Sequence, residues 1–349
     1  MNIAFDAKRY FHNHTGLGNY SRTLVGNLQL FHPEHHYTLL DERTLQRTFH
    51  LGHKAAEAGA EVLMGLSNEL PFDIDRHKAS PVRGIVTMHD VAWRTFPEMY
   101  HLPDRMLYDW KYGSSCRRAH HVICISESTR RDVMRFYGVK PERISAVYQP
   151  VQGLFYNPLS EAEVESLVGA EPDYILYVGS INSRKNLLAL LEALTLLTPE
   201  NRPRLIVVGN GREYRQRVEA FIAQHHLQAY VDIRSNVSDN RVLQALYTKA
   251  QAFVYPSFYE GFGLPIVEAA LQQTPIITTN VSSLPEAAGP DAFYFDPHAS
   301  DAAHQLAEHL SLLLSDRDLR RQKGQQMEAY ARATFDPERL THQLMETIK

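Results

Sequence analysis

Two carboxylates, Glu260 and Glu268, are separated by seven residues that include two glycines and a proline. A strand-like run, residues 252–256, precedes this segment, and an apolar run of helical type begins at Pro265. We therefore expect Glu260 in a loop and Glu268 about one turn into a helix, because proline is favoured at the first helical position. Amides at a helix start suit a phosphate, and carboxylates accept hydrogen bonds from paired hydroxyls. One ligand with a diphosphate, a ribose and a second sugar would use all of these groups.

The backbone between the two glutamates is expected to supply amide donors, because glycine lets a ligand approach the main chain closely. A second helix start, at Ser282 and Ser283, is expected to add donors for the phosphates. Ser283 and Glu286 also match a capping box. The residues of the first segment that we expect to line the ligand are Gly261, Phe262, Gly263 and Leu264.

Length and composition indicate a globular protein of two domains. The chain has 349 residues, which is long for one core, with 44% hydrophobic and 22% charged residues. A formal net charge of −4 gives no general attraction for nucleic acid or anionic lipid. Two cysteines cannot form a disulfide framework, and no apolar run approaches the roughly 20 residues of a membrane helix or resembles a signal peptide. We expect a cytoplasmic protein whose membrane contact is at most peripheral, on the inner face of the cytoplasmic membrane.

Candidate metal ligands are present but scattered. The 18 histidines follow no recognisable ligand spacing, and Asp-x-Asp occurs twice in unrelated contexts, at residues 73–75 and 316–318. A three-residue pattern often arises by chance, so we assign no metal to either tripeptide and expect no cofactor.

Strands alternate with helices in the first half of the chain, which predicts a parallel, doubly wound sheet. After the first strand, Gly16 and Gly18 are expected in a loop that leads into a helix with apolar positions at Tyr20 and Leu24. Further helices are expected at 104–118 and 126–136. The expected strands are residues 3–6, 36–40, 61–64, 84–88 and 121–125.

The alternation restarts in the second half, where a strand at 174–178 ends at Gly179. We expect an α/β protein with Rossmann-like domains at 1–150 and 171–330, facing each other across a cleft, with ligand loops at the carboxyl ends of the strands. Residues 151–170 are expected to be a linker, after a strand at 146–148, and a helix at 331–349 is expected to return to the first domain. The other expected strands are 205–208, 231–234, 253–255, 276–278 and 293–295.

Taken together, the motifs resemble glycosyltransferases of family 4, the large group 1 family with the GT-B fold. They occur in the family's order over nearly the whole chain, and those of the first half are most similar to bacterial mannosyltransferases that build O-antigen chains. The resemblance implies a hexosyltransferase that binds an acceptor with its first domain and a nucleotide sugar with its second. The motifs are Gly16-Leu17-Gly18-Asn19-Tyr20, Thr87-Met88-His89-Asp90, Ser126-Glu127-Ser128, Arg184-Lys185-Asn186 and the Glu260-x7-Glu268 segment.

Roles for the second-domain residues follow from the resemblance. Glu260 is expected to bind hydroxyls of the donor sugar, and Glu268 the ribose diol. Arg184 and Lys185 are expected to neutralise the diphosphate as the sugar departs. Lys185 matches the family lysine, whereas Ser180 stands where many relatives have arginine, so Arg184 would supply its charge from a different backbone position. The alternative is a solvated basic pair.

The resemblance also implies roles for the first domain. His89 is expected beside the donor sugar, where its ring or backbone would stabilise positive charge near the anomeric carbon. Gly16 and Gly18 would approach the diphosphate from the opposite domain, and His12 and His14 would lie near the acceptor.

The family retains anomeric configuration, and two routes remain open. A double displacement needs a carboxylate nucleophile, for which Glu260 is the motif candidate. We favour a front-side reaction in which the leaving phosphate takes the acceptor proton. GDP-mannose is the expected donor and a growing surface glycan or lipid-linked oligosaccharide the expected acceptor. The alternatives are a UDP- or dTDP-sugar, or a non-catalytic subunit that binds glycan or nucleotide sugar.

Two further segments are candidates for the acceptor side. Residues 68–71 follow a strand and form a plausible acceptor loop. Residues 93–135 combine eight Lys/Arg and five Asp/Glu with aromatic residues, a pattern that fits either a face near a lipid diphosphate carrier or an ordinary helix with a solvated face.

Overall fold

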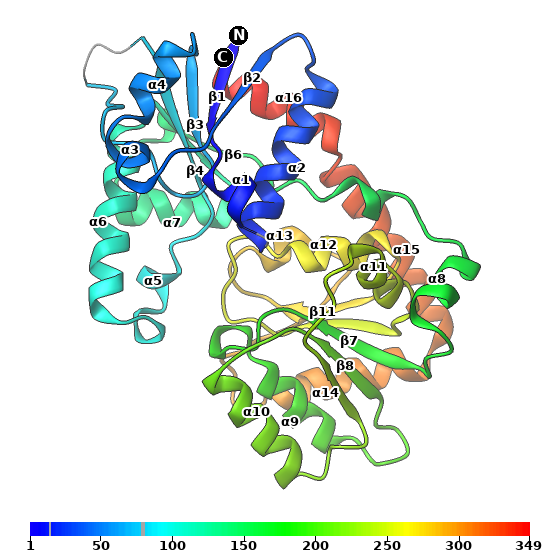
Figure 1. The fold of residues 1–349 in the computed structure, drawn as a ribbon. Helices are drawn as coiled ribbons and strands as arrows, with labels where there is room; N and C mark the ends of the chain where they lie inside the picture. Colours follow the sequence, from blue (N-terminus) through cyan, green and yellow to red (C-terminus); the bar gives the residue numbers. More distant parts are fainter. Residues whose placement is uncertain (14, 78–80) are drawn as a thin grey trace. The chain divides into compact units, whose positions relative to one another are not determined.

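The computed structural model describes residues 1–13, 15–77 and 81–349. These residues form two compact units (Figure 1). The first unit comprises Met1–Gln152 and Phe335–Lys349, and the second comprises Gly153–Thr334. Each unit is built on a six-stranded parallel sheet with helices around it, as the alternating sequence pattern predicts.

The first sheet has the order β2-β1-β3-β4-β5-β6. Its central strands are buried on both faces, which explains their continuous apolar sequences. The strand expected at 146–148 is found two residues earlier, at 144–146, and Ala146 is its last residue to pair with β5. The strands are β1 Asn2–Asp6, β2 His36–Leu40, β3 Val62–Gly65, β4 Arg83–Met88, β5 His121–Cys124 and β6 Ile144–Ala146.

Helices of the first unit begin and end at recognisable signals. The Ser126 side chain accepts a hydrogen bond from the Thr129 amide at the start of α7, and Gly138, with φ of +63°, ends that helix. The last helix, α16, packs against α2 within this unit. The helices are α1 Lys8–His12, α2 Gly16–Phe31, α3 Thr44–Phe49, α4 Leu51–Glu57, α5 Ala92–Thr95, α6 Leu102–Arg118, α7 Glu127–Tyr137 and α16 Pro337–Ile348, with 3₁₀ turns η1 Pro97–Met99 and η2 Pro141–Arg143.

The second sheet has the order β12-β11-β10-β7-β8-β9. Every residue of its strands β7, β10 and β11 is buried. The strands are β7 Tyr174–Val178, β8 Arg204–Val208, β9 Val231–Arg234, β10 Ala252–Tyr255, β11 Ile276–Thr279 and β12 Phe293–Phe295.

Helices of the second unit include α8, which lies in the segment expected to be a linker. This helix packs on α11, so residues 153–170 are part of the second unit rather than a free connection. The helices are α8 Glu161–Val168, α9 Leu187–Leu196, α10 Glu213–Gln224, α11 Asn240–Lys249, α12 Leu264–Leu271, α13 Leu284–Ala288, α14 Ala302–Ser315 and α15 Arg317–Thr334, with 3₁₀ turns η3 Gly153–Tyr156 and η4 Ser183–Lys185.

Candidate functional site

The motif residues of the second unit lie where the strand order of its sheet reverses. Strands β7 and β10 are neighbours, although the chain runs from β7 to β8 on one side of the sheet. Ligands of open α/β sheets bind at the carboxyl ends of strands beside such a reversal. The loop after β7 contains Arg184 and Lys185, and the loop after β10 contains Glu260. The fold therefore brings together residues that are about 75 positions apart in sequence.

Glu260 is buried and contacts both cations of the β7 loop. Its Oε2 lies 2.9 Å from Nη1 of Arg184, and its Oε1 lies 2.7 Å from Nζ of Lys185. Arg184 also donates to the Tyr259 carbonyl, and the Lys185 ammonium contacts the Tyr255 hydroxyl. These three charged side chains carry a net charge of about +1, with one carboxylate shared between two cations.

The two cations determine the charge of Glu260. Burial alone would raise the pKa of its carboxyl, but the charges of Lys185 and Arg184 outweigh that effect and lower the pKa to about 2. Glu260 is therefore ionised at any physiological pH.

Glu268 lies in a different environment, in the second turn of α12. It is half-buried, and its Oε2 accepts a hydrogen bond of 3.1 Å from the Tyr247 hydroxyl. Burial raises the pKa of Glu268 to about 7, although the bond from Tyr247 acts in the opposite direction. The carboxyl group is thus poised to accept or release a proton near neutral pH.

The start of α12 lies one residue before the start predicted at Pro265. The helix begins at Leu264 with Pro265 in its first turn, and Gly263 precedes it with φ of +112°, a conformation that strains any L side chain. Gly261 and Phe262 are both buried, and the Phe262 side chain is only 2% exposed. Phe262 can therefore serve a ligand only through its backbone.

The two serines expected to bind phosphate contact the Glu260 loop, and their binding of phosphate stays a prediction. The hydroxyl of Ser282 accepts a hydrogen bond of 3.0 Å from the Glu260 amide. The hydroxyl of Ser283 lies 2.8 Å from the Glu260 carbonyl and 2.9 Å from the Phe262 carbonyl, to which it donates. The capping-box prediction is wrong, because Ser283 makes no side-chain cap for α13.

Gly179 fixes the loop after β7 against the loop after β8. Its amide donates to the Val208 carbonyl at 2.9 Å. A Cβ atom on Gly209 would lie 1.9 Å from the Gly179 carbonyl oxygen. This close approach requires glycine at position 209, so Gly179 helps to shape the loop that bears the two cations.

In the first unit, Gly16 and Gly18 occupy the first turn of α2 rather than a loop. Position 18 requires glycine, because a Cβ atom there would lie 1.7 Å from the Asn13 carbonyl oxygen. Its amide donates to the Asn13 side chain at 3.2 Å. The expected contact of Gly18 with a ligand stays a prediction, and a Cβ atom on Gly16 would meet nothing within 4 Å.

Of the two histidines expected near the acceptor, His12 and His14, the structure describes only His12. His12 is exposed and lies 2.8 Å from the Asp41 carboxylate. His14 is outside the described residues.

His89 lies at the end of β4, buried, within a network of backbone contacts. Its Nε2 lies 2.8 Å from the Leu66 carbonyl, which can only accept, so this nitrogen carries the proton. Its amide donates to the Asn68 side chain at 2.7 Å, and its carbonyl accepts from the Thr129 hydroxyl. Burial lowers the pKa of His89, so the ring is neutral at physiological pH, with its N–H already used by Leu66.

A buried ionic network in the first unit was not predicted from sequence. Arg47 donates to Asp6 at the end of β1, with Nη2 2.7 Å from Oδ2, and to Glu69, with Nη1 2.6 Å from Oε2. Lys111 pairs with the other oxygen of Glu69 at 2.9 Å. The carboxylate in the predicted acceptor loop is therefore held by two cations.

The sequence models of two families match the chain. The family described as glycosyl transferases group 1 matches residues 160–333, and the family described as glycosyltransferase family 4 matches residues 69–152. The first range includes Arg184, Lys185 and both motif glutamates, and the second includes His89. The chain belongs to the group 1 glycosyltransferases.

Curated relatives of this glycosyltransferase include enzymes of O-antigen synthesis. O-antigen chain mannosyltransferase B from Escherichia coli is 34% identical over 241 residues, which are 67% of this chain and 62% of the relative. O-antigen chain mannosyltransferase RfbU from Salmonella typhimurium is 27% identical over 212 residues, 61% of this chain and 56% of the relative. The matches thus span about three fifths of these relatives' length.

Solved structures show that this glycosyltransferase has the GT-B fold. WaaG, a glycosyltransferase involved in lipopolysaccharide biosynthesis, superposes with a TM-score of 0.74 at 18% identity, covering 99% of each chain. Sucrose-phosphate synthase from Thermosynechococcus elongatus gives a TM-score of 0.80 at 20% identity, covering 99% of this chain and 98% of that one.

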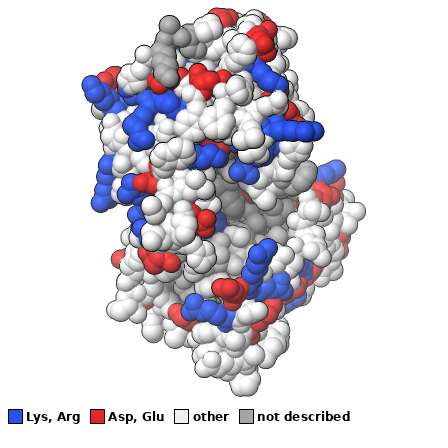
Figure 2. Space-filling view, turned by 60° about the vertical axis from the view of Figure 1, so that its left-hand side comes forward, with Lys and Arg blue, Asp and Glu red and all other residues white. Residues whose placement is uncertain are grey.

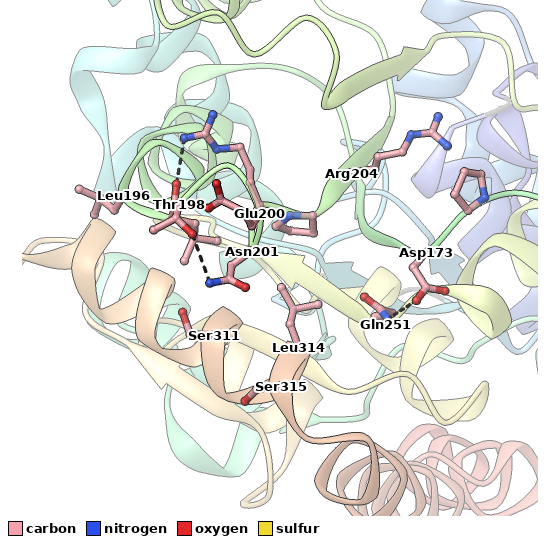
Figure 3. Close-up of a pocket in the computed structure, with 14 residues that line it drawn as sticks. Asp173, Leu196, Thr198, Glu200, Asn201, Arg204, Gln251, Ser311, Leu314 and Ser315 are labelled. Atoms are coloured by element: carbon pink, nitrogen blue, oxygen red, sulfur yellow. Dashed lines mark hydrogen bonds between the residues drawn. The ribbon is translucent and has the colours of Figure 1, made fainter.

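A large cavity in the second unit of the glycosyltransferase lies away from the motif residues. Its volume is about 790 Å³, and it is lined by residues that precede strands β7, β8 and β10 and by the end of α14 (Figure 3). Asp173 and Gln251 are hydrogen-bonded on its wall at 2.8 Å. The cavity is therefore at the amino ends of the strands, whereas Glu260 and the two cations follow their carboxyl ends.

Both Asp-x-Asp tripeptides of the glycosyltransferase contact backbone amides. The Asp73 carboxylate accepts from the Gly52 and His53 amides at the start of α4, at 3.1 and 2.8 Å. The Asp316 carboxylate accepts from the Leu319 amide at 2.9 Å. These bonds give each tripeptide a local structural role.

Sequence reasoning missed two tyrosines that contact the motif residues, Tyr255 beside Lys185 and Tyr247 beside Glu268. Tyr255 ends a strand just before the motif, so its position at a strand end was a usable signal. Tyr247 lies on another helix, α11, and no local pattern connects it to Glu268.

Proposed function

We propose that this chain is a retaining, metal-independent hexosyltransferase that moves mannose from GDP-mannose to a growing surface glycan or lipid-linked oligosaccharide. The observation that supports this best is the buried Glu260 paired with Arg184 and Lys185 at the strand-order reversal of the second sheet. The names of the curated relatives, which are O-antigen mannosyltransferases, support mannose as the sugar.

The two cations would bind the diphosphate of the donor. Arg184 and Lys185 outnumber the single carboxylate between them, so the site is cationic before a ligand arrives. A diphosphate accepts charge-assisted hydrogen bonds from both. As the bond from the anomeric carbon to the phosphate breaks, these cations stabilise the growing negative charge on the phosphate oxygen.

Each motif glutamate would bind a different pair of hydroxyls. Ionised Glu260 can accept hydrogen bonds from hydroxyls of the sugar. Glu268, with Tyr247 on one oxygen, can accept from the ribose diol once it has lost its proton.

The ion pairs of Glu260 favour the front-side route. Both carboxylate oxygens lie within 3 Å of a cation, which lowers their reactivity as nucleophiles. In the front-side route, the acceptor oxygen bonds to the anomeric carbon on the face from which the phosphate leaves, and a phosphate oxygen takes the acceptor proton. A trapped covalent sugar on Glu260 would contradict this route.

The first unit would contribute the acceptor-binding surface. His89, with its N–H donated to Leu66, would act through its backbone or as a neutral ring rather than as an acid. Gly16, at the start of the 16-residue helix α2, would offer an amide to an anionic group.

Transfer assays with a panel of donors and a mannose-terminated acceptor lipid test the proposal. We expect transfer from GDP-mannose in the presence of excess chelator, and a product whose anomeric configuration matches the donor. Transfer only from a UDP- or dTDP-sugar would show that GDP-mannose is not the donor. Nucleotide binding without transfer or hydrolysis across the panel would favour a non-catalytic binding subunit.

We also propose peripheral contact between α6 and a lipid surface. No helix in the described parts of the chain has the length and apolar character needed to cross a bilayer. Leu102, Met106 and Trp110 repeat every fourth residue of α6 and are each more than half exposed. Arg105 lies beside this row and suits anionic headgroups, whereas Arg94 there is paired with Asp109.

Vesicle co-sedimentation tests the α6 contact. We expect Met106→Glu with Trp110→Glu to reduce binding to vesicles with anionic lipid, while Leu312→Glu, at an exposed site on α14, leaves it unchanged. The face of the molecule seen in Figure 2 carries Lys and Arg as well as Asp and Glu among neutral residues. Equal co-sedimentation of all variants would contradict the proposal.

A further inference from the structure

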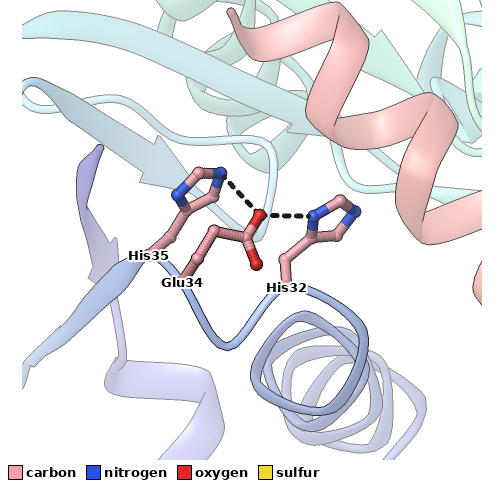
Figure 4. Close-up of side chains that lie close together, drawn as sticks. All are labelled: His32, Glu34 and His35. Atoms are coloured by element: carbon pink, nitrogen blue, oxygen red, sulfur yellow. Dashed lines mark hydrogen bonds and ion pairs between the residues drawn. The ribbon is translucent and has the colours of Figure 1, made fainter.

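Three side chains with metal-ligating atoms converge where α2 ends (Figure 4). His32 is the residue after α2, and Glu34 and His35 complete the turn that leads into β2. One nitrogen of each histidine and one carboxylate oxygen all lie within 4.8 Å of one another. None of these residues belongs to the sites described above.

The distances among the ligand atoms suit a tetrahedral ion. Oε1 of Glu34 lies 3.1 Å from Nδ1 of His32 and 3.5 Å from Nε2 of His35. Ligands about 2.0–2.1 Å from a tetrahedral zinc ion are roughly 3.3–3.4 Å from each other. Two of the three distances between ligand atoms are therefore already close to the value that a tetrahedral ion requires.

Burial of the two imidazoles strengthens this assignment. The side chains of His32 and His35 are 10% and 13% exposed. Nε2 of His35 is buried and faces the Glu34 carboxylate at 3.5 Å without a hydrogen bond of acceptable geometry among the described residues, and Nδ1 of the same ring lies 3.3 Å from the Met1 ammonium. A buried polar atom without a hydrogen bond is costly, and coordination of an ion would satisfy this nitrogen.

We propose that His32, Glu34 and His35 bind one divalent transition-metal ion of the zinc class, with water completing the coordination. Two imidazoles and a carboxylate are ligands that such ions prefer over magnesium or calcium. The competing interpretation is a trio held by hydrogen bonds from the two histidines to Glu34.

The position of the site indicates a structural role. Gly16 is at the opposite end of the 16-residue helix α2, about 24 Å away at 1.5 Å per residue. The His32 ring packs edge-on against the His342 ring of α16, with centroids 4.5 Å apart. A bound ion would therefore fix the α2–β2 turn against the helix that closes the first unit, without taking part in sugar transfer.

Calorimetric titration of chelator-treated full-length protein with Zn²⁺ tests the site, with Co²⁺ absorption as a second reading of the ligand set. We expect one tight equivalent in the wild type and a rise in melting temperature on loading. His32→Gln, Glu34→Gln and His35→Gln should each weaken this binding by on the order of 100-fold or more, since loss of a supporting residue alone costs 10–100-fold.

His36→Gln and His53→Gln are the matched controls, because both histidines are exposed and outside the group. They should bind like the wild type. Absence of a tight equivalent in the wild type would overturn the proposal, as would equal affinity in the three ligand variants. Glu34 is 59% exposed, so Glu34→Gln keeps the test valid if a histidine variant fails to fold.

Discussion

Glu260 and Glu268 are the same residue type in one motif, yet the structure gives them opposite electrostatic environments. Glu260 lies against two cations that lower the pKa of its carboxyl to about 2. Glu268 contacts a neutral tyrosine, and burial raises the pKa of its carboxyl to about 7. The difference shows that the motif spacing places the carboxyl groups, whereas residues distant in sequence determine their charge.

Among the changes that test this comparison, removing the charge of Glu260 should have the largest effect, and that effect is on turnover. We expect Glu260→Gln to lower kcat by about 10²–10³-fold, because a preorganised charge at the reacting sugar is lost. The affinity for GDP should change little, since the cations remain. Steady-state transfer and slow donor hydrolysis measure this, with the exposed Glu192→Gln as control. Near-normal turnover in folded Glu260→Gln would remove Glu260 from the chemistry.

The second-largest effect is expected from removing Lys185, one of the two cations that contact Glu260, and that effect is on nucleotide binding. We expect Lys185→Gln to reduce GDP affinity about 10- to 100-fold, the worth of a hydrogen bond to a charged group. Calorimetry measures this against Arg321→Gln, an exposed arginine on α15. Unchanged affinity would mean that Lys185 only neutralises Glu260.

The pKa of Glu268 predicts a pH dependence of binding. A ribose diol donates to the ionised carboxylate, so GDP affinity should rise about tenfold from pH 6 to pH 8, as the ionised fraction of a group with pKa about 7 rises. Glu268→Gln should abolish this rise. A dideoxyribose analogue of GDP controls for titration of the phosphate, and an equal rise with that analogue would contradict the assignment of Glu268 to the diol.

The smallest expected effect is on stability, and its sign differs between the two glutamates. The folded-state pKa of Glu268 is raised, so its contribution to the free energy of unfolding is present below about pH 4.5 and is lost as pH rises through about 7. Glu268→Gln should therefore raise the melting temperature by about 2 °C at pH 8 and have no effect at pH 4.

The contribution of Glu260 to the free energy of unfolding depends on pH in the opposite direction, because its folded-state pKa is lowered. Its contribution is present above about pH 4.5 and is lost as pH falls through about 2. Glu260→Gln should lower the melting temperature at both pH 5 and pH 8, as measured by calorimetry. A higher melting temperature for Glu260→Gln would show that the ion pairs do not stabilise the fold.

Local patterns in the sequence predicted most strands and the position of the loop that contains Glu260. The strands at 36–40 and 174–178 have the predicted bounds, although only the second is an apolar run buried along its whole length. Glu260 follows a strand and Glu268 lies on a helix, as predicted, because proline and glycine fix the helix start locally.

Details that depend on distant partners could not be predicted. Ser283 fits a capping box in sequence, but the Glu260 loop, over 20 residues away, takes its hydroxyl. Gly18 looks like a ligand loop, but the preceding turn at Asn13 fills the space beside it. Asp6 ends β1 and Glu69 follows β3, and only the fold shows that Arg47 lies between them.

Thermal shift with a panel of nucleoside diphosphates tests the central claim most directly, because a ligand stabilises a protein according to the ratio of its concentration to its dissociation constant. We predict that GDP raises the melting temperature more than UDP or dTDP at equal concentration, and that Lys185→Gln reduces this rise. A GDP shift no larger than those of UDP and dTDP would contradict the GDP-mannose proposal, and no shift with any of the three would contradict a nucleotide-sugar site between Glu260 and Glu268.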